Sequence, residues 1–95
     1  MKALFFSPAA QADIGNIWDY SAEDWGADQA DLYIDAIRDT CEALASGTRH
    51  ARASDARPGY LKCALNAHMI YFRTCETRVE VIRILHGKQD VQRHL

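Results

Sequence analysis

The apolar residues of this chain repeat with a helical period before Gly47 and in strand-like runs after Gly59. Before Gly47 they recur at three- and four-residue steps, in two runs separated by Gly26. After Gly59, short runs rich in β-branched and aromatic residues alternate with turn-forming residues. Helices and strands that occupy separate parts of one chain indicate an α+β fold.

The helical half predicts a hairpin of two amphipathic helices. Ser7 and Pro8 suit the N-cap and the first position of the first helix, which follows an apolar strand at residues 2–6. Gly26 separates the two helices and Gly47 acts as the C-terminal cap of the second. The two apolar stripes comprise Ile14, Ile17, Trp18, Ser21 and Trp25, and then Ala30, Tyr33, Ile34, Ile37, Cys41 and Leu44. Because each stripe needs cover, we expect the hairpin to pack on another layer and Trp18, Trp25 and Tyr33 to lie in the core.

The second half predicts that layer as a sheet of short strands. Short turns separate the runs, and strands joined by short turns form an antiparallel meander. The predicted fold is therefore β-α-α-β-β-β, with the helical hairpin on one face of a mostly antiparallel sheet. The expected strands are residues 60–65, 68–73 and 78–86; residues 47–58 are expected to be a basic loop, and residues 87–95 a short tail.

Length and charge narrow the functional classes. A chain of 95 residues makes one domain, residues 1–95, and we expect neither a signal peptide nor a membrane span. Three cysteines without paired metal spacing indicate a reduced, cytoplasmic protein. Residues 1–47 hold two basic and nine acidic residues, a net charge of −7, whereas residues 48–95 hold nine basic and four acidic residues, a net charge of +5. The basic half fits an acidic partner such as nucleic acid, a nucleic-acid enzyme or an acidic peptide, although the two halves also attract each other.

Motifs for catalysis are missing from the sequence. No nucleophile elbow, glycine-rich phosphate loop or metal-ligand spacing occurs, so we expect no catalytic residues, no metal and no cofactor. RNA cleavage needs fewer fixed residues, and Arg73, Arg83 and His86 on one sheet face would suffice in principle. No acidic residue is clearly placed as a base on that face, which favours a binding surface.

Several local patterns occur together in a recognisable order. They are Ser7-Pro8-Ala9-Ala10, Asp13-Ile14, Ile17-Trp18-Asp19-Tyr20, Trp25-Gly26, Tyr71-Phe72-Arg73, and Val81-Ile82-Arg83-Ile84-Leu85-His86-Gly87 with Asp90 and Arg93-His94-Leu95. In this order the chain resembles, over nearly its whole length, the ParE/RelE superfamily of type II toxin–antitoxin toxins, and its ending resembles the ParE branch.

The resemblance implies one of two activities. ParE-like members inhibit DNA gyrase by binding, whereas RelE-like members are ribosome-dependent mRNA endonucleases. His86 falls where some nucleases carry a catalytic histidine, but His68 stands where they carry an arginine. We therefore expect a gyrase inhibitor without chemistry of its own; an mRNA endonuclease is the alternative, and a pure interaction module is a third reading.

The resemblance also implies two binding surfaces. The residues expected to contact the target are Arg73, Arg83, His86, Lys88 and Arg93. A ParD-like antitoxin is expected to lay an apolar helix on the hairpin, in a groove formed by Ile14, Trp18, Trp25, Tyr33 and Ile37.

The last strand decides whether two of the target residues share a face. Strict alternation places Val79, Val81, Arg83 and Leu85 on one side, and Glu80, Ile82, Ile84 and His86 on the other. Arg83 and His86 are then separated unless a bulge intervenes.

Overall fold

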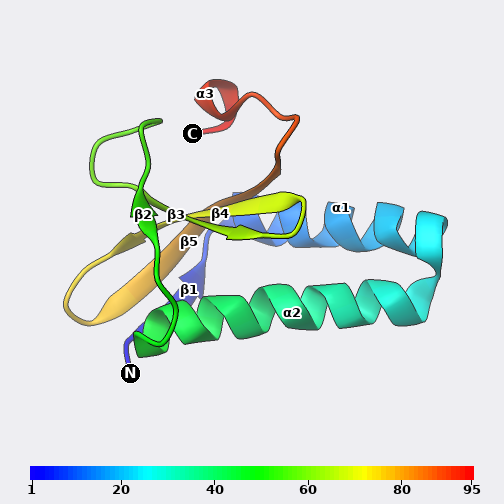
Figure 1. Ribbon diagram of the computed structural model, residues 1–95, viewed down its shortest axis with the longest axis horizontal. Coiled ribbons are helices and arrows are strands. Elements are labelled where there is room, and N and C mark those ends of the chain that lie inside the picture. The colour runs from blue at the N-terminus through cyan, green and yellow to red at the C-terminus, as the bar shows by residue number, and fades with distance from the viewer.

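A computed structural model describes residues 1–95 and arranges them in two main layers (Figure 1). The elements in chain order are β1 (Ala3–Phe6), α1 (Pro8–Trp25), α2 (Ala27–Ser46), β2 (Arg52–Ala53), β3 (Leu61–Leu65), β4 (His68–Thr74), β5 (Arg78–His86) and α3 (Val91–His94). In Figure 1, α2 lies below the sheet, α1 runs behind it and beyond it to the right, and the short α3 lies above it. The predicted α+β class and the helical hairpin on one face are confirmed.

The ends of both long helices follow from local chemistry. The Ser7 hydroxyl accepts a hydrogen bond from the Ala10 amide at 3.0 Å, and Pro8 occupies the first turn, where a missing N–H costs nothing. At Gly26 the backbone adopts φ +92°, and at Gly47 it adopts the left-handed φ +78° that closes α2. Neither long helix is apolar and long enough to cross a membrane.

The sheet contains five strands in the order β1-β5-β4-β3-β2. β1 pairs in parallel with β5, and the other neighbours are antiparallel, so the expected meander of β3, β4 and β5 is confirmed. A two-residue strand, β2, forms within the segment that the sequence predicts to be only a loop, and it pairs with β3. β5 lies between β1 and β4, so its register determines which of its residues lie on each face of the sheet.

A bulge in β5 corrects the predicted alternation. Tyr71 pairs with Arg83 and Phe72 pairs with Val81, which leaves Ile82 without a partner. Side chains before and after the bulge therefore change parity, and Val79 and Val81 join Ile84 in the core rather than sharing a side with Arg83. The prediction for Val79 and Val81 was wrong for this reason, and so was the prediction for Glu80, which pairs with Arg73 on the face opposite to Ile84.

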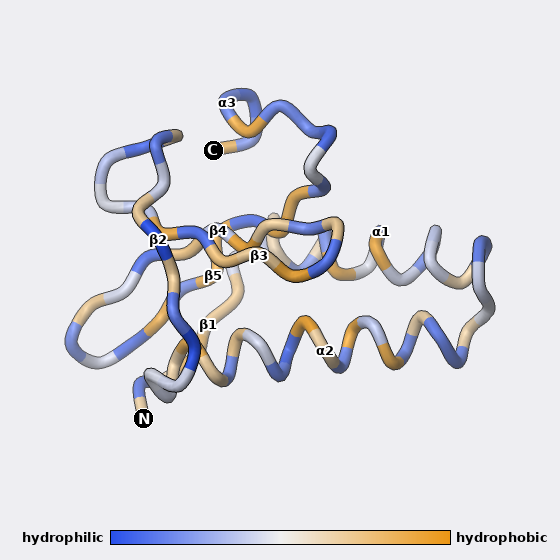
Figure 2. The backbone as a smooth tube through the Cα atoms, in the orientation of Figure 1, coloured by the Kyte–Doolittle hydropathy of each residue, from blue (hydrophilic) through white to orange (hydrophobic).

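The core fills the space between the hairpin and one face of the sheet. Residues of α1, α2 and three strands, β3, β4 and β5, form it, and Leu4 and Phe6 of β1 pack against it. Its members include Ala10, Ile14, Ile17, Ile37, Cys41, Leu44, Cys63, Ile70, Phe72, Val79, Val81 and Ile84. Apolar and polar residues alternate turn by turn along α2, as an amphipathic helix requires (Figure 2). The hairpin extends past the sheet, toward the right of Figure 1, so its tip has no sheet beneath it.

Candidate functional site

The sheet face turned away from the hairpin, here called the open face, carries most of the basic strand residues. Register places Lys62 beside Tyr71 and Tyr71 beside Arg83, and it places Arg73 beside Glu80. These residues lie opposite in parity to the core members Cys63, Ile70 and Phe72. The cationic side chains that the register places on the open face are Arg52, Lys62, Arg73, Arg78 and Arg83.

Arg73 is held loosely at the surface. Its Nη2 lies 2.6 Å from Glu80 Oε1, and its guanidinium carbon lies 5.6 Å from the centre of the Tyr60 ring. The hydrogen bond from Arg73 lowers the pKa of the Glu80 carboxyl. Because more than half of the Arg73 side chain is exposed, this ion pair is weak and the guanidinium can exchange Glu80 for another carboxylate.

Arg83 is held firmly by Asp13. Its Nε and Nη2 donate to the two carboxylate oxygens of Asp13, each at 2.8 Å, and Nη1 donates to the carbonyl oxygen of His94 at 3.3 Å. The hydrogen bond with Asp13 raises the pKa of the guanidinium. The Arg83 and Asp13 side chains are only 19% and 10% exposed, so this bidentate pair is largely buried. Arg83 therefore joins α1, β5 and the C-terminal tail, and it is engaged rather than free for a partner.

Asp13 also belongs to a set of side chains that satisfy the edge of β5 beyond the end of β1. Its Oδ2 accepts the Ile84 amide at 2.9 Å, the Ser7 hydroxyl donates to the Ile82 carbonyl at 2.6 Å, and Gln89 Oε1 accepts the His86 amide at 2.7 Å. An unpaired strand edge would otherwise invite pairing with another chain. These contacts give Ser7 and Asp13 structural roles that span more than 70 residues of sequence.

His68 and His86 meet on the hairpin side of the sheet. The hydroxyls of Tyr20 and Tyr33 lie 2.6 Å from Nε2 and Nδ1 of His68, and the His86 ring meets the His68 ring edge-on with centres 5.4 Å apart. Burial, and then the charge of His86, lowers the pKa of His68. Nδ1 of His86 accepts the Lys88 amide at 3.1 Å, which assigns the proton of a neutral His86 ring to Nε2. No group of three or more His, Cys, Asp or Glu side chains is placed to hold a metal ion.

Both ring nitrogens of His68 are thus used to tie the hairpin to the sheet. Arg83 and His86 lie on opposite faces, as the alternation beyond residue 82 requires, because the bulge precedes both residues. The five predicted target residues are therefore not brought together as one centre.

The C-terminal tail carries the remaining two predicted target residues. Lys88 and Arg93 are exposed and form no ion pair. Asp90 caps the short α3 by accepting the Gln92 amide at 3.0 Å. α3 lies on the side of the sheet away from α2 (Figure 1), and the bond from Arg83 to the His94 carbonyl ties it to the open face.

Comparison with known proteins identifies the family. The family described as "ParE toxin of type II toxin-antitoxin system, parDE" matches residues 4–91. The chain is 41% identical over 91 residues to Toxin ParE1 of Mycobacterium tuberculosis, covering 94% of this chain and 93% of that protein. The chain belongs to the ParE toxin family. It is also 35% identical over 96 residues to Toxin ParE1 of Caulobacter vibrioides, covering 100% of this chain and 99% of that protein.

A solved structure supports the fold of this ParE toxin. A chain of the chromosomal ParDE TA system from P. aeruginosa superimposes with a TM-score of 0.79, covering 90% of this chain and 96% of that chain. Its sequence identity of 22% supports the likeness of fold alone. The predicted superfamily and architecture are both confirmed.

The five residues predicted to form the antitoxin groove of this ParE toxin differ in exposure: two are buried, two are partly buried and one is exposed. Ile14 and Ile37 are 8% and 0% exposed and pack in the core. Trp18 is partly buried and donates from Nε1 to Asp31 Oδ1 at 2.8 Å, and Tyr33 bonds to His68. Trp25, expected in the core, is 72% exposed because it lies at the tip of the hairpin, beyond the sheet.

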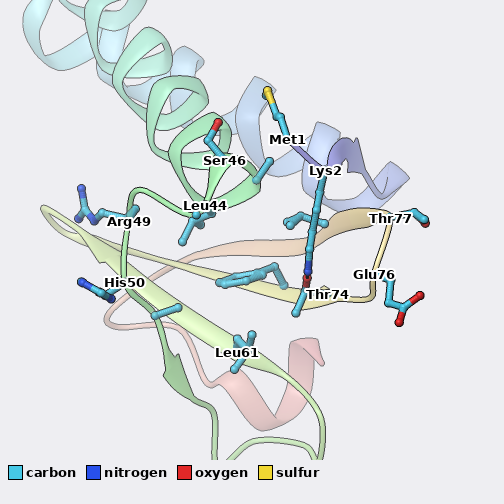
Figure 3. A pocket seen from close by; sticks show the side chains of 15 residues that line it. Met1, Lys2, Leu44, Ser46, Arg49, His50, Leu61, Thr74, Glu76 and Thr77 are labelled. Atoms are coloured by element: carbon cyan, nitrogen blue, oxygen red, sulfur yellow. Dashed lines mark hydrogen bonds between the residues drawn. The ribbon is translucent and has the colours of Figure 1, made fainter.

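Sequence reasoning missed the largest hollow of this ParE toxin, a pocket of about 780 Å³ beside the end of α2 (Figure 3). Leu44, Leu61 and Phe72 supply apolar walls, and the Lys2 ammonium reaches across to the Thr74 hydroxyl at 2.7 Å. Arg49 and His50 line another side, and Arg49 donates to the Ala64 carbonyl at 2.9 Å. The one sequence signal was the basic character of residues 47–58.

Proposed function

We propose that this ParE toxin inhibits DNA gyrase by binding it, with no chemistry of its own. The observation that carries the proposal is the pairing of a basic open face with a basic tail on the same side of the sheet. Arg52, Arg73 and Arg78 on the open face and Lys88 and Arg93 in the tail are exposed cations. They would meet carboxylates of the enzyme or phosphates of its DNA. His86 lies on the hairpin side of the sheet and is left out of this surface, which revises the expectation from sequence that it contacts the target.

Arg83 has a different role in this proposal. It holds Asp13 and the carbonyl of His94, so it positions the tail rather than touching the target. This assignment revises the expectation from sequence that Arg83 is itself a contact.

The alternative function, RNA cleavage, requires a different arrangement of side chains. A nuclease needs a general base and acid within hydrogen-bonding reach of one substrate. In this chain both nitrogens of His68 are bonded to tyrosines, and Arg83 and His86 lie on opposite faces. These contacts favour binding over cleavage.

A ParD-like antitoxin is the second partner in the proposal. The neutralising segment would be acidic and partly apolar, since it would have to cover the basic surfaces of the toxin. The pocket beside the end of α2 offers apolar walls with Lys2 and Arg49 at its rim, and therefore suits such a segment. Toxin and antitoxin would form a hetero-oligomer in the cytoplasm.

The test is a supercoiling assay with purified gyrase, which should lose activity and accumulate linear DNA when the toxin is added. Charge reversal of both Lys88 and Arg93 to Glu should raise the toxin concentration for half-inhibition by at least about tenfold, as expected for losing two contacts of about 1 kcal/mol each. Asp28→Lys, an exposed charge change on α2, is the matched control and should leave inhibition within about twofold.

A parallel assay with ribosomes and messenger RNA separates the alternatives. Cleavage at codon spacing that is lost in His86→Ala would overturn the gyrase proposal in favour of an endonuclease. If the toxin in excess neither inhibits gyrase nor cleaves messenger RNA, both proposals are wrong, and the remaining hypothesis is a pure interaction module that only binds a partner.

A further inference from the structure

A groove separates the tip of the α1–α2 hairpin from the turn between β3 and β4. This junction groove has a volume of about 410 Å³. Its lining includes Tyr20, Asp24 and Trp25 from α1, Asn66 and Ala67 from the turn, and His68 and His86 from the sheet. Trp25 is 72% exposed and Tyr20 is 39% exposed, so two aromatic rings stand open to solvent at one site. Exposed large apolar groups that gather in a concave site mark an interaction surface more often than scattered ones do.

The hairpin that forms one wall of the junction groove is strongly acidic. Residues 8–46 contain nine acidic residues and one basic residue, Arg38. Only Asp13 among the nine is buried and paired with an arginine, and the exposed acids are Asp19, Glu23, Asp24, Asp28, Asp31, Asp35, Asp39 and Glu42. The hairpin therefore presents an excess of seven negative charges, and this excess repels nucleic acid and acidic peptides.

The Asp24 carboxylate brings this charge into the groove itself. Burial, and then the charge of Asp24, raises the pKa of the Tyr20 hydroxyl, which is consistent with the carboxylate lying close to the ring. Tyr20 is fixed in place because its hydroxyl is bonded to His68 Nε2 at 2.6 Å. Burial lowers the pKa of His68 and favours its neutral form, so the histidine behind the ring does not offset the acid.

We propose that the junction groove accepts a lysine or arginine side chain from a basic segment of a protein partner. The faces of Trp25 and Tyr20 attract the cation, and Asp24 pairs with it. The indole ring of Trp25 also covers the aliphatic stem of the incoming side chain. The hairpin side thus binds basic protein, whereas the open face and the tail bind acidic groups.

The two surfaces are on opposite sides of the sheet, which allows one toxin to engage partners of both charges. Under the proposed function, the surface of a DNA-handling enzyme supplies such lysines and arginines, since such enzymes carry basic residues for their own substrate. This last step rests on the proposed function, whereas the chemistry of the groove does not.

The test titrates the ¹⁵N-labelled toxin with two short peptides of equal length and equal apolar content, one rich in lysine and arginine and the other in aspartate and glutamate. The basic peptide should shift the Trp25 indole N–H and the amides of Asn66 and Ala67 in a saturable way. Trp25→Ala should weaken its binding about tenfold, and Asp24→Asn about fivefold, as cation–π and ion-pair contacts at a half-exposed site predict.

The matched control is Asp39→Asn, which neutralises an exposed acid of α2 that does not line the groove and should change affinity by less than about twofold. Trp25 and Asp24 are exposed, so circular dichroism should confirm that both variants fold. Equal binding of the acidic peptide, an absence of shifts with the basic one, or equal effects of Asp24→Asn and Asp39→Asn would overturn the proposal.

A gyrase assay with the same variants gives a separate outcome. If the unmodified toxin fails to inhibit gyrase, the proposed target is wrong while the peptide result still decides the groove. If the toxin inhibits and Trp25→Ala inhibits equally well, gyrase is not the basic partner.

Discussion

Replacing Asp13 by Asn tests the bidentate ion pair that joins α1 to β5. The substitution keeps the size of the side chain and an oxygen for the Ile84 amide, but removes the negative charge that faces Arg83. Leaving one partner of a buried pair alone costs about 3–5 kcal/mol, and the 19% exposure of Arg83 brings the expected loss to about 2.5 kcal/mol. With a urea m-value of about 1.3 kcal/mol/M, the unfolding midpoint should fall by about 2 M.

Three further variants make this measurement specific. Asp13→Ala also orphans the Ile84 amide and should cost about 1 kcal/mol more than Asp13→Asn. Asp19→Asn, an exposed position on the same helix, should stay within about 0.5 kcal/mol of the unmodified protein. In a double-mutant cycle with Arg83→Met, the two losses should fall short of additivity by at least about 1 kcal/mol. Additive losses, or an Asp13→Asn variant as stable as Asp19→Asn, would refute the structural role given to this ion pair.

Two other predictions concern thiols and protons. Burial raises the pKa of the Cys41 thiol to about 12, and Cys63 is also buried. Cys75 is exposed, and hydrogen bonds with Thr77 lower its pKa. A thiol reagent at pH 8 should therefore modify Cys75 alone until urea unfolds the chain. Rapid modification of all three thiols in the folded protein would contradict the burial of Cys41 and Cys63 in the core. Because burial lowers the folded pKa of His68, its contribution to stability is complete above the unfolded pKa of about 6.5 and is lost as pH falls through the lower folded value. Urea midpoints at pH 7.5 and pH 5 should therefore differ more for the unmodified protein than for His68→Gln, and equal differences would exclude His68 as the source.

The sequence was informative where local rules decide structure. Ser7, Pro8, Gly26 and Gly47 set the helix ends by capping and backbone chemistry, which acts over a few residues. The strand runs after Gly59 likewise have the β-branched and aromatic composition that a half-buried sheet needs. Local chemistry of this kind can be read from one sequence.

The sequence-based predictions were wrong where segments that are distant in the chain pack together. Trp25 falls on the apolar stripe of its helix, but α1 has 18 residues and spans about 27 Å, so its end passes beyond the sheet that covers the rest of the stripe. Because Ile82 is unpaired, the side chains of β5 before it and after it alternate out of phase, and the composition of the strand does not indicate this bulge. Both features depend on lengths and registers of elements that are far apart in the chain.

The Asp13–Arg83 pair changes how a basic last strand in this chain is interpreted. Arg83 lies among the residues that resemble the family most strongly, and a cation there suggests contact with a target. Its two strong bonds are instead made to α1, and its third holds the carbonyl of His94 in the tail. A loss of toxicity in any Arg83 variant therefore has two causes, lower stability and a displaced tail. The double-mutant cycle distinguishes these two causes from the loss of a direct contact between Arg83 and the target, because Asp13→Asn displaces Arg83 without removing its charge. Toxicity that falls in step with stability across the Asp13 and Arg83 variants would assign Arg83 to positioning, and leaves Arg73, Lys88 and Arg93 as the cations that meet the target.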